Sequence, residues 1–225
     1  MRLLAIDAST WWGGIALLEV QEGVPKVVAE IGVHVEGSHA ARLLPLVEGL
    51  LATSAWTKGS IDAYAAVRGP GSFTGVRVAL GLMRGFALAA GRPCVGVGTL
   101  DAMADAYGPA AADRVPLLDA GRGEVYGARF DPGASPPIEL RGAWVGDSAQ
   151  ALESGSTVVL FGEGARLHEA RLREAGYVGP IGRAGTSVNA AAGRIALSKL
   201  AAGTVAAGEV APLYVRPAST TVRLV

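Results

Sequence analysis

The stretch of this sequence with the clearest chemical potential is residues 68–81, RGPGSFTGVRVALG, in which four glycines and two hydroxyl side chains lead into an apolar segment. Backbone amides at a helix N-terminus bind anions, so Gly71, Ser72 and Thr74 could hold a phosphate group. The competing interpretation is that the glycines turn the chain tightly and that Ser72 or Thr74 caps the helix. Because the Lys-Ser/Thr pair of a P-loop is missing, we favour the second interpretation over tight nucleotide binding by this chain alone. As a weaker role in binding, the glycine loop could form one wall of a pocket that is shared with another chain.

A second group of candidate residues is Asp7, Ser9 and Thr10, which come directly after the first apolar segment. In a kinase-like cleft the carboxylate would hold a hydrated cation and the hydroxyls would contact phosphate. Trp11 and Trp12 follow at once, and two indoles facing a phosphate would crowd such a site. We therefore prefer a strand-end aspartate in an Asx turn, and the role of the two tryptophans stays open.

The segment LLDAGRGEVYGARF repeats this arrangement in the second half, with Asp119 in the place of Asp7. Asp119 and Glu124 across a turn could act as an acid and a base. Arg122 lies between them, and we expect it to hold both in ion pairs and to lower their pKa values. A charged surface hairpin is the preferred interpretation.

The candidate phosphate-contacting residues of the whole chain are Asp7, Ser9, Thr10, Gly69, Gly71, Ser72, Thr74 and Gly75.

Segments typical of β-strands precede and follow each acidic turn and must position it. The first half has the pattern of three strands, a helix, a strand, a helix and a short strand, over residues 2–7, 15–20, 25–35, 39–53, 62–67, 74–90 and 94–98. The second half repeats the βββαβα order. This duplication predicts an α/β protein with the two-lobed actin-like ATPase (ribonuclease H-like) fold, with mixed sheets and flanking helices. We place the N-terminal lobe at 1–102 and the C-terminal lobe at 103–225, with the last helix and tail able to pack back on the N-terminal lobe.

Composition limits the kinds of partner. The 225 residues suffice for two lobes, and the formal net charge is zero with no cluster of cations. A chain that binds nucleic acid alone needs such a cluster, so any contact with nucleic acid is expected to be indirect. A single cysteine and the early Asp7 favour a reducing, cytoplasmic location without a signal peptide. The longest apolar stretch is interrupted by Arg84, so we expect no membrane span.

The segments MRLLAIDAST, RGPGSFTGVRVALG, GTLDAMA, LLDAGRGEVYGARF and PLYVRP together resemble the bacterial TsaB (YeaZ) family. The resemblance extends in order over nearly the whole chain. It implies a role in making threonylcarbamoyladenosine next to the tRNA anticodon. It also implies a heterodimer with TsaD, a relative with the same fold that carries the catalytic metal, and a partnership with the ATPase TsaE. No cofactor is expected in this chain itself, and ATP or ADP would lie at the junction with partner subunits.

The metal-binding positions of TsaD-type chains differ here. Those chains carry a His-x-x-x-His pair after the strand that follows the glycine loop, and two histidines four residues apart can share a metal. In this chain Thr99 and Met103 stand at the corresponding places, and neither is a suitable ligand. The remaining histidines are scattered, at His34, His39 and His168. We therefore expect no metal, no catalytic residue and no enzymatic activity of this chain on its own.

The helices expected at 39–53 and 74–90 are apolar over more of their circumference than one core face needs. Either both are interior to their lobe or they pack against a partner, and Gly81 and Gly85 permit a close approach of another helix. Given the resemblance, we prefer a four-helix contact with the matching helices of TsaD, or with a second copy of this chain when it is alone. The predicted interface residues are His39, Leu43, Leu46, Leu50, Val76, Leu80, Met83 and Ala87.

Two other functions compete with this interpretation. A free-standing, nucleotide-dependent enzyme of the kinase type would use Asp7, Asp119 and the glycine loop. A glycoprotease-type hydrolase would use Ser72 as its nucleophile. The second has the weaker support, because no His-Asp pair lies at a recognisable spacing from Ser72.

Overall fold

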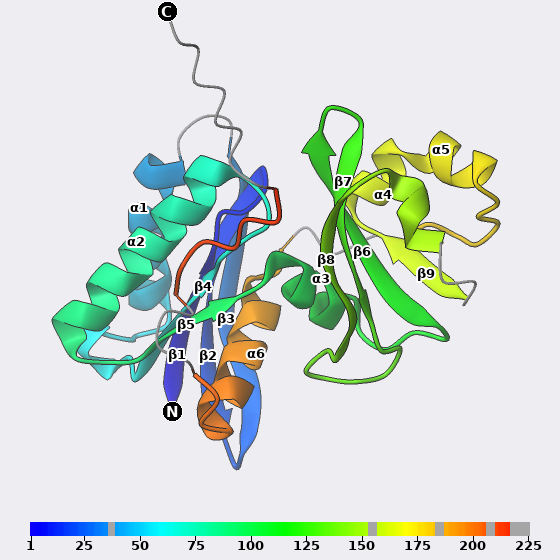
Figure 1. Ribbon diagram of the computed structural model, residues 1–225. Helices are drawn as coiled ribbons and strands as arrows, with labels where there is room; N and C mark the ends of the chain where they lie inside the picture. Colours follow the sequence, from blue (N-terminus) through cyan, green and yellow to red (C-terminus); the bar gives the residue numbers. More distant parts are fainter. Residues whose placement is uncertain (36–38, 153–156, 183–186, 206–209, 217–225) are drawn as a thin grey trace, which may run out of the picture.

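The computed structural model describes residues 1–35, 39–152, 157–182, 187–205 and 210–216, with the backbone alone for 39–41. The N-terminal lobe contains one five-stranded sheet in the order β3-β2-β1-β4-β5 (Figure 1). Its strands are β1 (Arg2–Asp7), β2 (Trp12–Gln21), β3 (Val24–His34), β4 (Ala63–Val67) and β5 (Cys94–Val97). Its helices are α1 (His39–Thr53), the short 3-10 helix η1 (Lys58–Ser60) and α2 (Phe73–Ala90).

The C-terminal lobe repeats the start of this topology in a four-stranded sheet of order β8-β7-β6-β9. Its strands are β6 (Asp113–Gly121), β7 (Glu124–Phe130), β8 (Glu139–Gly146) and β9 (Val158–Phe161). Its helical elements are η2 (Ser148–Leu152), α4 (Glu163–Leu167) and α5 (Glu169–Glu174). In both lobes the first strand pairs antiparallel with the second and parallel with the fourth. The predicted duplicated, two-lobed α/β fold is thus confirmed, although a short 3-10 helix occupies the first helical position of the second unit.

The central strand β1 is apolar on both of its faces because helices cover both sides of the sheet. Leu4 and Ile6 point toward α1 and α2 and share one core with them. Leu3 and Ala5, one residue out of phase, join a second core on the opposite face. The helix α1 begins at His39, ahead of Pro45, so the proline lies inside the helix and does not mark its start.

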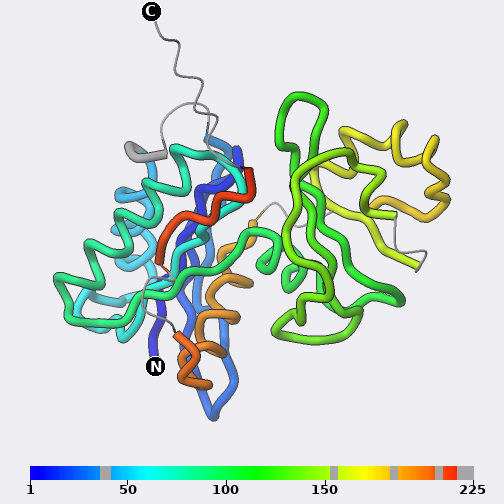
Figure 2. Tube along the Cα trace, in the orientation of Figure 1, coloured from blue at the N-terminus to red at the C-terminus, as the bar shows by residue number. Residues whose placement is uncertain are grey.

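The helix α6 (Asn189–Ala201) covers the opposite face of the N-terminal sheet, and α3 (Thr99–Tyr107) packs against α6 and against β6 of the C-terminal sheet. Figures 1 and 2 show α3 between the two sheets and α6 returning to the N-terminal lobe after the C-terminal lobe is complete. The same apolar core continues into the second lobe, through Phe130 and Phe161. A boundary after residue 102 therefore falls inside α3, whose side chains belong to the core that both lobes share.

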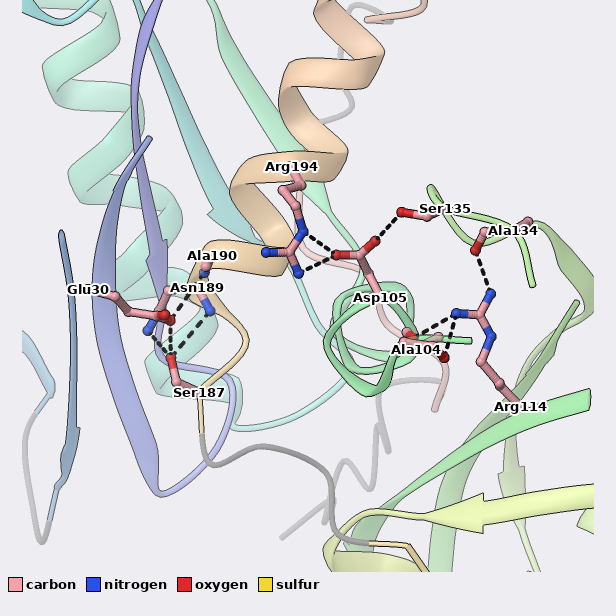
Figure 3. A network of polar contacts seen from close by, with 11 residues as sticks. Glu30, Ala104, Asp105, Arg114, Ala134, Ser135, Ser187, Asn189, Ala190 and Arg194 are labelled. Carbon is pink, nitrogen blue, oxygen red and sulfur yellow. Dashed lines mark hydrogen bonds and ion pairs between the residues drawn. The ribbon is translucent and has the colours of Figure 1, made fainter. Parts of the chain in front are cut away.

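Polar contacts strengthen the junction around α3 and α6 (Figure 3). Asp105 on α3 forms an ion pair of 2.7 Å with Arg194 on α6 and accepts a hydrogen bond of 3.1 Å from the Ser135 hydroxyl. At the N-terminus of α6, the Glu30 carboxylate accepts a hydrogen bond of 3.2 Å from the amide of Ala190. A carboxylate at this end of a helix is favourable because free amides and the helix dipole present positive charge there.

The fully buried side chain of Arg114, on β6, is the strongest of these polar links. Its guanidinium donates to four backbone carbonyls, those of Ala104 (2.9 Å), Gly108 (3.2 Å), Asp131 (2.7 Å) and Ala134 (2.6 Å). Two of these carbonyls belong to the C-terminal end of α3 or follow it, so Arg114 satisfies acceptors that the helix leaves unpaired.

The helix α2 is long and apolar enough to cross a membrane by length and composition, with a mean hydropathy of 1.3 over 18 residues. Here one of its faces is packed against the N-terminal sheet, and Arg77 and Arg84 lie on the opposite, exposed face. This is the arrangement of a helix at the surface of a folded lobe.

We predict that Arg114→Lys lowers the free energy of unfolding by about 3 kcal/mol, since the ammonium cannot reach all four carbonyls and leaves buried acceptors unpaired. Denaturant unfolding monitored by circular dichroism measures the change. Arg122→Lys, at an exposed position of the β6–β7 turn, is the control and is expected to change stability by less than about 0.5 kcal/mol. Equal effects of the two substitutions would refute the role assigned to Arg114.

Candidate functional site

The glycine loop and the β1–β2 turn are in direct backbone contact, and this contact forms the base of the cleft between the lobes. The amide of Ser72 donates a hydrogen bond of 2.6 Å to the carbonyl oxygen of Ser9. A Cβ atom added at Gly71 would overlap that same oxygen, and one added at Gly75 would overlap the carbonyl oxygen of Ala8. Only residues without a side chain permit so close an approach.

Ser72 acts as the N-cap of α2, because its hydroxyl accepts a hydrogen bond of 3.2 Å from the amide of Gly75. The interpretation of this loop as a tight turn with a helix cap is confirmed for Ser72. Its amide is already bonded to Ser9 and is therefore not free for an anion. Phosphate contacts at Gly71 and Thr74 stay a prediction.

The predicted phosphate-contacting residues mostly meet along one interlobe cleft with a volume of about 640 Å³. Those that line it are Ser9, Thr10, Gly71, Ser72, Thr74 and Gly75. Asp119, at the end of β6, faces them from the C-terminal lobe. Gly69 lines a separate groove beneath the C-terminal segment, and Asp7 lines a smaller cavity described next. The topology thus brings the two acidic turns to one cleft, as the duplicated fold requires.

Asp7 is only 3% exposed and lines an inner cavity of about 150 Å³ between the lobes. Its Oδ1 accepts a hydrogen bond of 2.7 Å from the amide of Ser9, the Asx turn expected from the sequence. Burial raises the pKa of Asp7 to about 6, although hydrogen bonds from Ser9 and Ala8 act in the opposite direction. Among the described residues, no cation forms an ion pair with this carboxylate.

Thr99 and Met103 line the same inner cavity as Asp7, on the first turns of α3. Both are buried, and the hydroxyl oxygen of Thr99 has no hydrogen-bond partner in the described part of the chain. Their side chains present a hydroxyl and a thioether to the carboxylate. Over the described ranges there is no group of three or more His, Cys, Asp or Glu side chains placed to hold a metal ion.

The ion pairs of the β6–β7 hairpin differ from those that the sequence predicted. Glu124 forms its ion pair with Arg216 of the C-terminal segment, and Asp119 lies 3.7 Å from the imidazole of His168. Arg122 occupies the exposed turn with a φ of 60° and forms an ion pair with neither carboxylate in the described chain. The prediction for Arg122 was wrong because a left-handed turn residue directs its side chain outward, away from the strand ends.

Most of the predicted partner-contacting residues belong to the core of their own lobe. The buried ones are Leu43, Val76, Leu80, Met83 and Ala87. They cannot form an exposed interface, and the prediction is wrong for them because an amphipathic helix buries its most continuous apolar stripe against its own sheet. Leu46 and Leu50 are half-buried beside that core, and the side chain of His39 lies outside the described residues.

The exposed face of α2 carries a different set of residues. Arg77, Gly81, Arg84, Gly85 and Leu88 follow one stripe along the helix, and all of them are exposed. A Cβ added at Gly81 or Gly85 would meet open space. On α1, Leu44 is also exposed. This surface of α1 and α2, with the α2 stripe at its centre, is called the α1–α2 face below.

Sequence reasoning missed the C-terminal segment 210–216 as part of the site, although it identified the segment as an extended tail. The amide of Leu213 donates a hydrogen bond of 2.7 Å to the carbonyl of Arg68, and the guanidinium of Arg77 donates one of 2.9 Å to the Tyr214 hydroxyl. Arg216 then reaches the β6–β7 hairpin, where it pairs with Glu124. Figure 2 shows the segment, in red, along the N-terminal lobe, and the ion pair of Arg216 with Glu124 links it to the C-terminal lobe.

We predict opposite effects of two glycine replacements on α2. Gly75→Ala is expected to lower the free energy of unfolding by about 3 kcal/mol, since the methyl group would overlap the carbonyl of Ala8. Gly81→Ala is the matched control and is expected to raise it by about 0.5–1 kcal/mol, because an exposed helix interior favours alanine. Thermal and denaturant unfolding of both variants measure these changes. A tolerated Gly75→Ala would contradict the close contact.

We also predict that Asp7→Asn stabilises the protein above neutral pH. Because the folded pKa of about 6 lies above the usual 3.8, the folded state favours the protonated acid, and stability is lost as pH rises from about 4 through 6. Asparagine cannot ionise. The increase in the free energy of unfolding caused by Asp7→Asn is therefore expected to be small at pH 4 and about 3 kcal/mol at pH 8. Unfolding curves of both proteins from pH 4 to 8 test this, and a difference that does not vary with pH would count against it.

Known proteins with similar sequences support the family resemblance that the motifs of this chain indicate. Residues 31–135 match the family model described as TsaD, tRNA N6-adenosine threonylcarbamoyltransferase. The chain is 38% identical to the tRNA threonylcarbamoyladenosine biosynthesis protein TsaB of Escherichia coli over 154 residues, which are 68% of this chain and 62% of that protein. It is 38% identical to the protein of the same name from Haemophilus influenzae over 128 residues, 56% of this chain and 52% of that one. The matched part thus spans about half to three-fifths of the length of these curated relatives.

The whole fold also has solved counterparts. The crystal structure of YeaZ from Pseudomonas aeruginosa superposes with a TM-score of 0.75 at 25% identity, covering 95% of this chain and all of that one. A second Pseudomonas aeruginosa structure, described as an uncharacterised protein similar to peptidase YeaZ, gives a TM-score of 0.74 at 27% identity, over 96% of this chain and 99% of the other. The sequence identities, the shared motifs and the common two-lobed fold show that this chain belongs to the TsaB (YeaZ) family.

Proposed function

We propose that this chain is the non-catalytic partner subunit of the assembly that makes threonylcarbamoyladenosine next to the tRNA anticodon, and that it binds and activates a TsaD-type protein. The relatives named TsaB support the pathway, and the match to the TsaD family model supports a common origin of the two subunits. The single observation that carries the proposal is that Thr99 and Met103, which the sequence resemblance places where TsaD-type chains have histidines, line the inner cavity beside Asp7.

This cavity supports a non-catalytic role on chemical grounds. A hydroxyl and a thioether are poor ligands for the divalent metals that imidazole binds, and Asp7 alone would supply one carboxylate. With the Ser72 amide bonded to Ser9, the glycine loop also presents fewer free donors to a phosphate. We expect any ATP or ADP to bind at the junction with partner subunits, where another chain can complete the site.

The α1–α2 face is the proposed contact with the TsaD-type subunit. Gly81 and Gly85 leave open space on a helix that exposes Leu88, so another helix can approach the backbone closely. Arg77 and Arg84 on the same stripe favour a partner surface that contributes carboxylates. The same face would allow a homodimer when the chain is alone, and we expect TsaE to join the complete assembly. We expect the assembly to be cytoplasmic. We expect the partner subunit to bind the tRNA directly, because this chain has a formal net charge of zero.

A second candidate function is a free-standing, nucleotide-dependent enzyme. The observation that favours it is the interlobe cleft, which joins the glycine loop to Asp119 in a volume of about 640 Å³. Calorimetry with ATP and magnesium discriminates the two proposals. Tight binding and turnover by the isolated chain, both lost in Asp7→Asn, would favour the enzyme. A peptidase has less support, because the Ser72 hydroxyl is engaged as the helix cap.

We predict that the double variant Gly81→Gln, Leu88→Glu weakens binding to the TsaD-type protein of the same genome at least about tenfold. It should also lower the threonylcarbamoyladenosine content of tRNA in cells that depend on this chain. Both positions are exposed, Leu88 by 86%, so folding should be unaffected. Co-purification and mass spectrometry of tRNA nucleosides measure the two effects.

The matched control is Val178→Glu, which adds the same charge at a 95% exposed position of the C-terminal lobe and should leave both readouts unchanged. Substitution of Leu80 or Met83 would not be informative, because both side chains are buried and a charge there would unfold the lobe. Undiminished binding by the double variant would reject the α1–α2 face as the interface.

A further inference from the structure

The inner cavity contains polar groups that the proposed partner role does not use. It is lined by the β1–β2 turn, the N-terminus of α3, the end of β6 and the start of α4, and it is partly open to solvent. Asp7 lies in its wall, almost fully buried, and has no cationic partner among the described residues. The Thr99 hydroxyl lies in the same wall, and in the described chain it neither donates nor accepts a hydrogen bond.

A buried carboxylate without a cationic partner and a buried hydroxyl without a hydrogen-bond partner, in one wall, carry a cost for folding. A buried hydroxyl loses its hydrogen bonds to water without replacing them, and a buried charge loses still more of its solvation. The protein keeps both groups in a cavity, where a ligand with several hydrogen-bond donors would satisfy them together. A carboxylate and a hydroxyl oxygen are both acceptors, so the matching group is a donor with positive charge.

Aromatic side chains form the outer wall of the cavity. Trp11 is 62% exposed and Trp12 is 38% exposed, and both line it. The ring of His34 packs edge-on against Trp12, with 5.4 Å between the ring centroids. Indole faces attract cations through their electron-rich π-systems, most strongly where water is excluded. These tryptophans would crowd a phosphate, but they suit an ammonium group.

Charged residues of α4 complete the rim. Glu163 and Arg166 both line the cavity, and neither is in an ion pair with a described residue. Glu163 adds to the preference for a positive ligand. Arg166 would contact a carboxylate if the ligand has one.

We propose that this cavity binds a small molecule through a primary ammonium group, which the Asp7 carboxylate and the Thr99 hydroxyl hold while the indoles cover it. A free amino acid would in addition place its carboxylate at Arg166, whereas a simple amine would not use that residue. The volume of about 150 Å³ suits a ligand of roughly six to eight heavy atoms. The site stands independently of the partner function proposed above.

The test is calorimetric titration of the full chain at pH 8, where Asp7 is ionised, with ethanolamine, L-alanine and L-threonine as probes. Lactate, in which a hydroxyl replaces the ammonium group of alanine, is the matched ligand control. Saturable binding of an amine or amino acid with a Kd below about 10 mM, and at least tenfold weaker binding of lactate, are expected. Emission from the tryptophans should change along the same binding curve.

Three variants assign the contacts. Asp7→Asn, which keeps the shape of the side chain and should fold well, is expected to weaken all ammonium ligands at least about tenfold, as loss of a charge-assisted hydrogen bond requires. Arg166→Gln should weaken the two amino acids and leave ethanolamine unchanged. Glu174→Gln, which removes a carboxylate at an exposed position of α5, should change none of them.

The proposal fails if the unsubstituted chain binds none of the three probes below 10 mM, or if Asp7→Asn binds them equally well. It also fails if lactate binds as tightly as alanine. Binding of ATP that displaces no amine but is lost in Asp7→Asn would instead assign Asp7 to a nucleotide site.

Discussion

The close contact between the backbone of the glycine loop and the backbone of the β1–β2 turn is the constraint on which the cleft depends. The bond from the Ser72 amide to the Ser9 carbonyl holds the start of α2 against the end of β1. Gly75 makes this possible because any side chain there would enter the space of the Ala8 carbonyl. The direction of α2, and with it the separation of its buried and exposed faces, follows from this contact.

The two lobes form one body because α3 has no solvent-facing side of its own. It lies between the sheets, and its apolar residues belong to a core that extends from Leu3 in one lobe to Phe161 in the other. Arg114 adds a polar link by donating to the carbonyls at the end of this helix. Since a fully buried guanidinium is tolerated only when its donors are paired, this link also specifies one relative position of β6 and α3.

The cavity at the centre of the molecule combines features that oppose stability. Asp7 is a carboxylate whose pKa is raised by burial, so keeping it ionised costs free energy at neutral pH. Thr99 is a buried hydroxyl without a partner in the described chain. Proteins retain such groups where they serve binding or chemistry, because apolar residues of the same volume would stabilise the fold more. Exposed tryptophans, such as those beside these groups, are likewise retained where they serve binding.

The sequence by itself determined the order of the strands, the helices α1 and α2, the duplicated two-lobed architecture and the Asx turn at Asp7, but it did not predict α3. These follow from local patterns, since apolar periodicity and turn residues act over a few neighbouring positions. The cap at Ser72 was predictable for the same reason, as one of two local candidates.

Only the tertiary structure decided which apolar residues are available to a partner and which charges form pairs. Val76 and Leu80 have the periodicity of either a core or an interface, and the position of the sheet assigns them to the core. Likewise, Glu124 pairs with Arg216, a residue far along the chain, because the C-terminal segment reaches the β6–β7 hairpin. Contacts between distant segments depend on how whole helices and strands pack together. A local pattern in the sequence does not specify this packing.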